Sequence, residues 1–181
     1  MKKYLSLSFV IVVFTFLSCG NDKKKSEPEV IEVETAETSV EYNSGNIDVT
    51  FTDEKLAEVF KQYVQLKTAL VKTNAERAGM QASKLMDVFV RIGANEAAVK
   101  ATQDMMDSKD VEVQRTAFVT VTAEVEKMLQ GAIAEGTIYK QHCPMAFGNT
   151  GASWLSERKE IYNPYFGDKM LKCGRVEAEI K

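Results

Sequence analysis

Two short stretches near the C-terminus collect side chains that could bind a soft metal ion. In QHCPM, the only histidine of the chain, His142, directly precedes Cys143, and Met145 follows two residues later. The second stretch, MLKCG, contributes Met170 and Cys173. Thiolates and thioethers are soft ligands and imidazole is intermediate, so this set suits Cu(I) or Ag(I). These five side chains are the predicted metal ligands, on the expectation that the chain folds back between the two stretches.

The ligand set does not favour zinc, and it leaves a second interpretation open. A structural zinc ion takes four ligands from cysteine, histidine and carboxylates, whereas these stretches offer only three thiol or imidazole groups. Alternatively, Cys143 and Cys173 form a disulfide across a loop of about 30 residues, which would stabilise the fold by roughly 3.5 kcal/mol. Oxidation would remove the thiolates that a metal needs, so a redox-sensitive metal site is a third possibility.

The N-terminus has the composition of a secretory signal peptide. Lys2 and Lys3 precede an apolar run over residues 9–17, which is too short to span a bilayer. The run ends in FLSCG, which resembles the lipobox of bacterial lipoproteins. The resemblance implies that residues 1–18 are removed and that Cys19 is acylated, although cleavage as an ordinary secreted protein is the alternative.

Charge and cysteine content exclude one class of partner and indicate a compartment. Residues 1–18 contain two lysines and no acidic residue, so the mature chain carries 21 basic against 26 acidic side chains, a net charge of −5. Such an acidic protein has no electrostatic attraction for nucleic acid. Acylation of Cys19 would leave two thiols in an oxidising compartment, where they can pair.

Three segments are expected beyond the signal peptide. Residues 19–50 are polar and mostly acidic, which predicts a disordered tether. Residues 51–135 carry apolar residues at helical spacing, with breaks that suggest helix starts at Thr52 or Asp53, near Asn74, near Asn95, and at Ser108 or Asp110. The rest of the chain, 136–181, loses this period and gains glycine, proline and aromatic residues.

These segments predict a mainly α protein. Four helices joined by short breaks favour an up-and-down four-helix bundle, on which the loop-rich, aromatic segment 136–181 should pack. A di-metal or haem site inside such a bundle would need histidine on the helices, and His142 lies outside them. The sequence also has no glycine-rich phosphate loop and no catalytic serine or zinc-protease motif, so we expect no enzyme activity.

A family resemblance is visible in the C-terminal segment. The runs QHCPMAFGNTGASWLS and IYNPYFGDKMLKCG resemble the signature of the bacterial domain of unknown function 3347, and YVQLKTALVKTNAERA resembles its helical half. That family occurs alone in lipoproteins and at the C-termini of periplasmic adaptor subunits of copper and silver efflux systems. The resemblance covers roughly residues 55–181. It implies an association with periplasmic metal handling.

Two functions from different classes are therefore expected. In the first, the chain is a lipid-anchored protein of the cell envelope, facing the periplasm, that binds or buffers soft metal ions near heavy-metal efflux adaptor proteins. In the second, the aromatic residues around Trp154 and Tyr165 dock an envelope or efflux partner, and Cys143–Cys173 is a structural disulfide. A third hypothesis is an enzyme that uses Cys143 as nucleophile and His142 as its base. It is disfavoured because the side chains of adjacent residues rarely point at each other.

Overall fold

The computed structural model describes residue 42 and residues 44–181, which all fall within one compact unit. The predicted signal peptide, the predicted acylation site Cys19 and most of the predicted tether lie outside the described residues. In chain order the elements are β1 (Thr50–Phe51), α1 (Glu54–Val71), α2 (Ala75–Ile92), α3 (Glu96–Asp107), α4 (Val111–Leu129), β2 (Ile133–Glu135), β3 (Ile138–Cys143), α5 (Ala146–Asn149), β4 (Ala152–Ser156), the 3-10 helix η1 (Gly167–Met170) and β5 (Arg175–Ile180).

Each of the four long helices begins at a capping side chain. A side-chain oxygen accepts a hydrogen bond from a backbone N–H of the first turn, which satisfies one of the otherwise unpaired donors there. The cap residues are Asp53, Asn74, Asn95 and Asp110, with bonds of 2.8–2.9 Å. The helix starts expected from the sequence are therefore confirmed at all four places.

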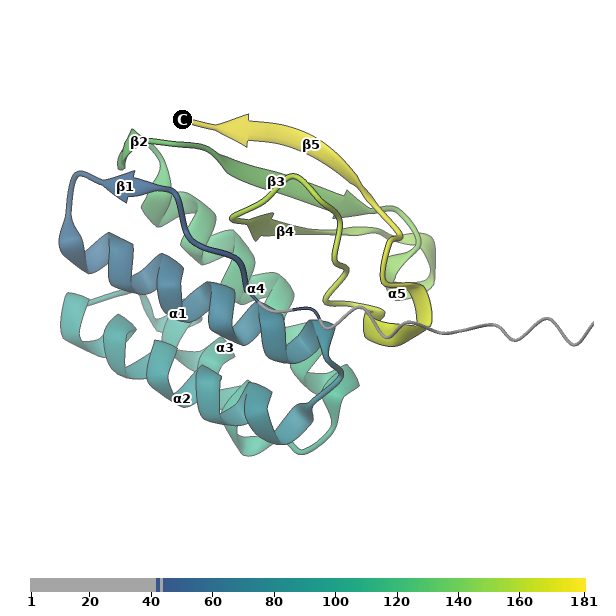
Figure 1. Ribbon diagram of the computed structural model, residues 1–181. Helices are drawn as coiled ribbons and strands as arrows, with labels where there is room; N and C mark the ends of the chain where they lie inside the picture. The colour runs from purple at the N-terminus through teal and green to yellow at the C-terminus, as the bar shows by residue number, and fades with distance from the viewer. Residues whose placement is uncertain (1–41, 43) are drawn as a thin grey trace, which may run out of the picture. The chain divides into compact units, whose positions relative to one another are not determined.

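The four helices form the predicted bundle. Successive helices pack against each other along the chain, α1 also contacts α4, and α4 contacts β4. Figure 1 shows α2 farthest from the sheet strands, with α1 and α4 between. The mainly α fold class is thus confirmed. In the described part of the chain, no helix has the length and apolar character needed to cross a membrane.

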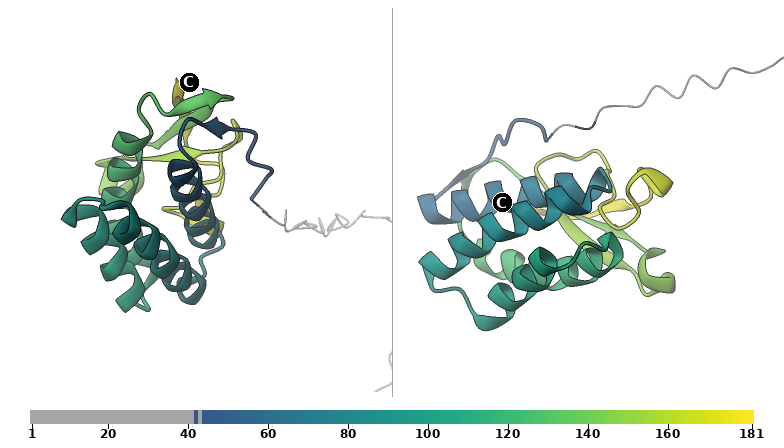
Figure 2. Two further views of the ribbon diagram at one scale, coloured as in Figure 1. Left: turned by 90° about the vertical axis from the view of Figure 1, so that its left-hand side faces the viewer. Right: turned by 90° about the horizontal axis from the view of Figure 1, so that it is seen from below.

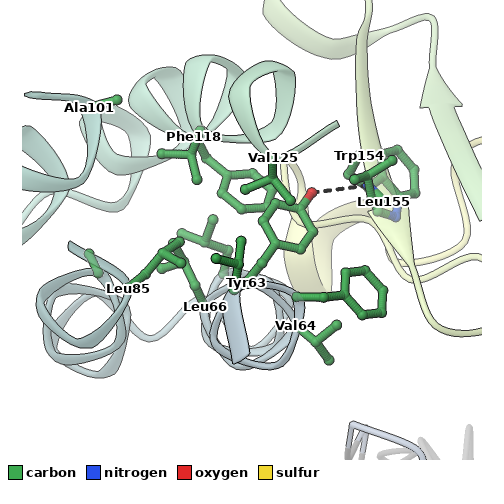
Figure 3. Packing of buried hydrophobic residues seen from close by; sticks show 14 of the residues in the cluster. Tyr63, Val64, Leu66, Leu85, Ala101, Phe118, Val125, Trp154 and Leu155 are labelled. Atoms are coloured by element: carbon green, nitrogen blue, oxygen red, sulfur yellow. Dashed lines mark hydrogen bonds between the residues drawn. The ribbon is translucent and has the colours of Figure 1, made fainter. Parts of the chain in front are cut away.

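A buried tyrosine joins the bundle to the sheet. Tyr63 on α1 is fully buried, and its hydroxyl accepts a 3.0 Å hydrogen bond from the backbone N–H of Leu155 on β4. The same hydroxyl shares a 2.9 Å hydrogen bond with Thr122 on α4. The dashed line in Figure 3 marks the hydrogen bond between Tyr63 and Leu155. Burial raises the pKa of Tyr63 well above its ordinary value, so the hydroxyl stays neutral and available for these bonds.

The C-terminal segment is more regular than the loop-rich segment that the sequence predicted. Three antiparallel strands form a sheet in the order β4-β3-β5, and Figure 2 shows this sheet as a layer on one side of the helices. In the register between β3 and β4, Gln141 pairs with Trp154 and Cys143 pairs with Ala152. The strands were missed because β3, IYKQHC, shows no clean alternation of apolar and polar residues.

The predicted tether also ends earlier than residue 50. Tyr42 and Val49 are buried, and β1 pairs with β2 immediately after the predicted boundary. The ring of Phe51 lies 5.7 Å from that of Phe60 on α1. Apolar side chains spaced through this polar stretch therefore bind it to the bundle, so disorder is wrong for residue 42 and residues 44–50.

Candidate functional site

The QHCPM stretch forms the end of β3 and the turn that follows it. Side chains on a strand alternate between its two faces. Gln141 and Cys143 are fully buried, whereas His142 between them is only half-buried. The cysteine therefore points into the molecule and the histidine points toward the open face of the sheet.

The loop between β4 and β5 brings Cys173 to the buried thiol. Asn163, which is fully buried, donates from Nδ2 to the carbonyl oxygen of Cys173 at 2.8 Å. The Cys173 N–H donates to the carbonyl oxygen of Met170 at 3.0 Å. The result is an Sγ–Sγ distance of 2.9 Å between Cys143 and Cys173. The fold-back that the sequence predicted for the two cysteines is present.

The distance between the two sulfur atoms determines whether the pair can share a metal ion or form a disulfide bond. Both cysteines are free thiols. Two sulfurs bound to one tetrahedral ion at about 2.3 Å lie about 3.8 Å apart, and a disulfide bond is about 2.05 Å long. The observed Sγ–Sγ distance of 2.9 Å lies between these two values. A small movement of the sulfurs apart would fit a shared metal ion, and a small movement together would fit a disulfide bond. The hydrogen bond with Cys143, together with burial, raises the pKa of Cys173 to about 11.

The structure separates His142 from the thiol pair, which corrects the predicted ligand set. Its Nδ1 lies 2.9 Å from Oγ of Ser153 on β4, and this hydroxyl donates in turn to Glu177 on β5 at 3.3 Å. The ring also packs over Gly151, where a Cβ atom would lie 2.8 Å from it. The alternation of strand side chains puts these contacts on the face opposite Cys143. His142 is therefore not positioned as a partner of the thiol, as a ligand or as a base.

The two predicted methionine ligands lie beside the thiols along the chain. Met145 is 46% exposed in the turn after β3, and Met170, at the end of η1, is half-buried. Within residue 42 and residues 44–181, no three or more His, Cys, Asp or Glu side chains form a group that could hold a metal ion. Any metal held here would thus depend on the two thiols and on the thioethers, which carry no charge.

The aromatic residues expected to dock a partner are instead part of the core. Trp154 is fully buried and Tyr165 is 4% exposed. The Tyr165 ring packs against those of Trp154, Phe118 and Phe147 at centroid distances of 5.4–6.0 Å, and its hydroxyl donates to the Ser153 carbonyl at 2.7 Å. An exposed docking surface around Trp154 and Tyr165 is therefore wrong.

The NPYFG stretch positions the thiol loop through contacts that the sequence did not reveal. The Asn163 side-chain oxygen accepts hydrogen bonds from the backbone N–H groups of Tyr165 and Phe166, which closes a tight turn. Arg115 on α4, almost fully buried, donates from Nε to the Pro164 carbonyl at 2.9 Å. These contacts fasten the loop that carries Cys173 to the helical bundle.

Gly167 completes this attachment through its lack of a side chain. Its φ is +55°, and a Cβ atom there would lie 2.2 Å from the Thr73 hydroxyl and 3.0 Å from the Val71 carbonyl. Only glycine allows the loop to approach the end of α1 so closely without strain. A motif of the form N-P-Y-F-G is the sequence signal from which this turn could have been predicted.

Comparison with known proteins gives one family match, which lies in the helical part of the chain. The model described as "Protein of unknown function (DUF3347)" matches residues 59–136, which run from the second turn of α1 to the residue after β2. The match ends before β3 and the thiol pair. No curated protein and no solved structure gives a significant match. Residues 59–136 are therefore similar to the DUF3347 family, the family that the sequence resemblance predicted.

Proposed function

We propose that this protein binds a soft monovalent metal ion, Cu(I) or Ag(I), through Cys143 and Cys173. The observation that carries the proposal is the 2.9 Å approach of two thiols contributed by stretches 30 residues apart. Soft thiolate ligands select Cu(I) over the hard cations that carboxylates and carbonyls prefer. Met145 and Met170 are the nearest soft donors along the chain, and they would complete the coordination.

Binding at this pair would be coupled to proton release. A metal binds the thiolate form, so it must displace the thiol protons. The raised pKa of Cys173 means that its proton is held more tightly than that of an ordinary cysteine. Apparent affinity should therefore rise with pH, by about tenfold per pH unit for each proton released.

We further propose that the protein acts in the cell envelope, in association with heavy-metal efflux. The lipobox-like FLSCG sequence, with acylation at Cys19, would anchor it in a membrane facing the periplasm. Family resemblance supports efflux adaptor proteins as partners. Buffering or delivery of metal ions needs only binding and release, so no catalytic step is included.

We expect reduced protein, prepared without oxygen, to bind one Cu(I) ion per chain in competition with a soft chelator. Cys143→Ser and Cys173→Ser should each weaken binding by at least about 100-fold, since each removes a direct ligand. The matched control is His142→Ala, which should bind like the wild type because His142 faces away from the thiols. Equal copper occupancy in the wild type and the cysteine variants would contradict the proposal.

A second candidate, a non-metal protein-interaction module stabilised by a Cys143–Cys173 disulfide, is favoured by one observation. The sulfurs lie nearer to each other than two ligands of a single tetrahedral ion would. A thiol count on untreated mature protein distinguishes the candidates. Two reactive thiols at these positions would support the metal site, and none, even after mild reduction, would support a permanent disulfide.

A further inference from the structure

We propose that Cys143 and Cys173 form a reversible thiol–disulfide switch that closes the metal site when it is oxidised. The inference rests on the proposed function for the site, but its redox step can be measured without metal. Three features of the structure carry it: the contact between the sulfurs, the support of the loop by other bonds, and the unequal exposure of the two cysteines.

The contact between the sulfurs allows the bond to form with little movement. The Sγ atoms already lie 2.9 Å apart, and a disulfide requires about 2.05 Å. Cys143 pairs with Ala152 on β4, and the strand that carries it also pairs with β5 up to His142, so Cys143 is the fixed member of the pair. The loop that carries Cys173 must therefore make the small movement that brings the two sulfurs to bonding distance.

Bonds that do not involve sulfur hold that loop in place. The Asn163 N–H donates to the Leu171 carbonyl at 2.9 Å, and its side chain holds the Cys173 carbonyl. Arg115 holds Pro164, and Gly167 packs directly against α1. The reduced chain thus keeps its thiols together without a covalent bond.

The two cysteines differ in their access to solvent. Cys143 is fully buried, whereas Cys173 is half-buried. An exchange partner therefore meets Cys173 first. Its thiolate attacks a small-molecule or protein disulfide, one partner thiolate leaves, and a mixed disulfide forms on Cys173. Cys143, as a thiolate, then attacks the Cys173 sulfur and releases the second partner thiolate.

The overall exchange is balanced and consumes both metal ligands. Two protein thiols lose two protons and two electrons and gain one S–S bond. The partner disulfide loses its S–S bond and takes up the electrons and protons as two thiols. Neither sulfur of the product is a thiolate, so the oxidised chain would release a soft ion or fail to bind one.

The test is titration of the full chain with defined ratios of reduced to oxidised glutathione, followed by thiol trapping. The expected result is a reversible, single two-electron transition with folded protein at both ends. Cys143→Ser should accumulate a mixed disulfide with glutathione on Cys173, whereas Cys173→Ser should accumulate at least about tenfold less on buried Cys143. Far-UV circular dichroism shows whether each variant is folded.

Asn163→Asp probes the positioning of Cys173. The aspartate keeps an oxygen for the Tyr165 and Phe166 N–H groups but loses the N–H donor to the Cys173 carbonyl. The effective concentration of the two thiols should fall by about tenfold, which would shift the glutathione midpoint toward more oxidising ratios. Asn149→Asp, at an exposed position near the same end of β3, is the control and should leave the midpoint unchanged.

The outcomes separate the switch from the metal site. Cu(I) binding by the reduced form and at least a 100-fold weaker binding by the oxidised form would support the switch. A pair that resists oxidation, or equal binding by both forms, would overturn the switch and leave the metal site standing. A reversible thiol–disulfide transition with no Cu(I) binding by the reduced form would overturn both the metal site and its control by oxidation. Unfolding upon reduction would overturn the switch in favour of a structural disulfide.

Discussion

Replacing Lys67 with methionine is expected to lower the free energy of unfolding by about 3–5 kcal/mol. Lys67 on α1 and Glu157 after β4 form an ion pair with an Nζ–Oε2 distance of 2.5 Å, and their side chains are 1% and 0% exposed. Removing the lysine leaves a buried carboxylate without its main partner. Arg158 remains with Nε 3.2 Å from the other Glu157 oxygen, which favours the lower end of the range.

A double variant tests whether the loss comes from the stranded charge. Lys67→Met combined with Glu157→Leu removes both ions, so most of the lost stability should return, as seen by urea unfolding. Lys61→Met is the control, because its pair with Glu58 is exposed and should change stability by less than about 0.5 kcal/mol. A Lys67→Met variant as stable as the wild type would contradict the stabilising role given to the Lys67–Glu157 ion pair.

The buried Glu157 carboxyl should also make the stability of the protein depend on pH. Burial by itself would raise the pKa of this carboxyl, but the charge and hydrogen bond of Lys67, a backbone hydrogen bond and the charge of Arg158 together outweigh burial, and the net pKa is lowered. A pKa below the unfolded value of about 4.3 gives stability that is present above that pH and is lost as pH falls through the folded pKa. Glu157→Gln should flatten the acid limb of a stability curve measured from pH 5 to 2.

Replacing Gln141 with glutamate is expected to cost about 3 kcal/mol at pH 7. The buried Gln141 amide donates to three backbone carbonyls, those of Arg158, Lys159 and Glu160, at 2.9–3.2 Å. A carboxylate in the same place would face three oxygens and have no proton to donate. The loop that leads to NPYFG would lose its attachment to β3.

The loss from Gln141→Glu should shrink when the pH is lowered. Protonation restores one donor, which can satisfy one of the three carbonyls. Gln130→Glu, at the exposed end of α4, carries the same charge change and should alter the unfolding free energy by only a few tenths of a kcal/mol. Equal losses in the two variants in urea unfolding would contradict the role given to Gln141.

The helical half was predictable because its signals are local. A cap residue and a 3.6-residue apolar period lie within a few positions of each other, and Asp53, Asn74, Asn95 and Asp110 each marked a helix start. The sheet was not predictable in this way. The β5 sequence, RVEAEI, alternates polar and apolar residues, but its pairing with β3 joins residues 33–42 positions apart, so no local signal identified its partner.

The meeting of the two cysteines was predictable from the sequence, but the position of His142 and the contacts that support the thiol loop were not. Order along the chain suggested that Cys143 and Cys173 would meet, and they do. His142 was grouped with them because it is adjacent in sequence, but adjacency on a strand places side chains on opposite faces. The supporting contacts of Asn163 and Arg115 join segments that are distant in sequence, so no local pattern indicated them.

X-ray absorption at the copper edge of the reduced, Cu(I)-loaded protein tests the central claim most directly, because it reports the atoms bound to the metal. An all-sulfur shell with at least two sulfur ligands is predicted, unchanged in His142→Ala and lost in the Cys143→Ser/Cys173→Ser double variant. A histidine nitrogen in the shell, or a chain that retains no copper after desalting, would contradict it.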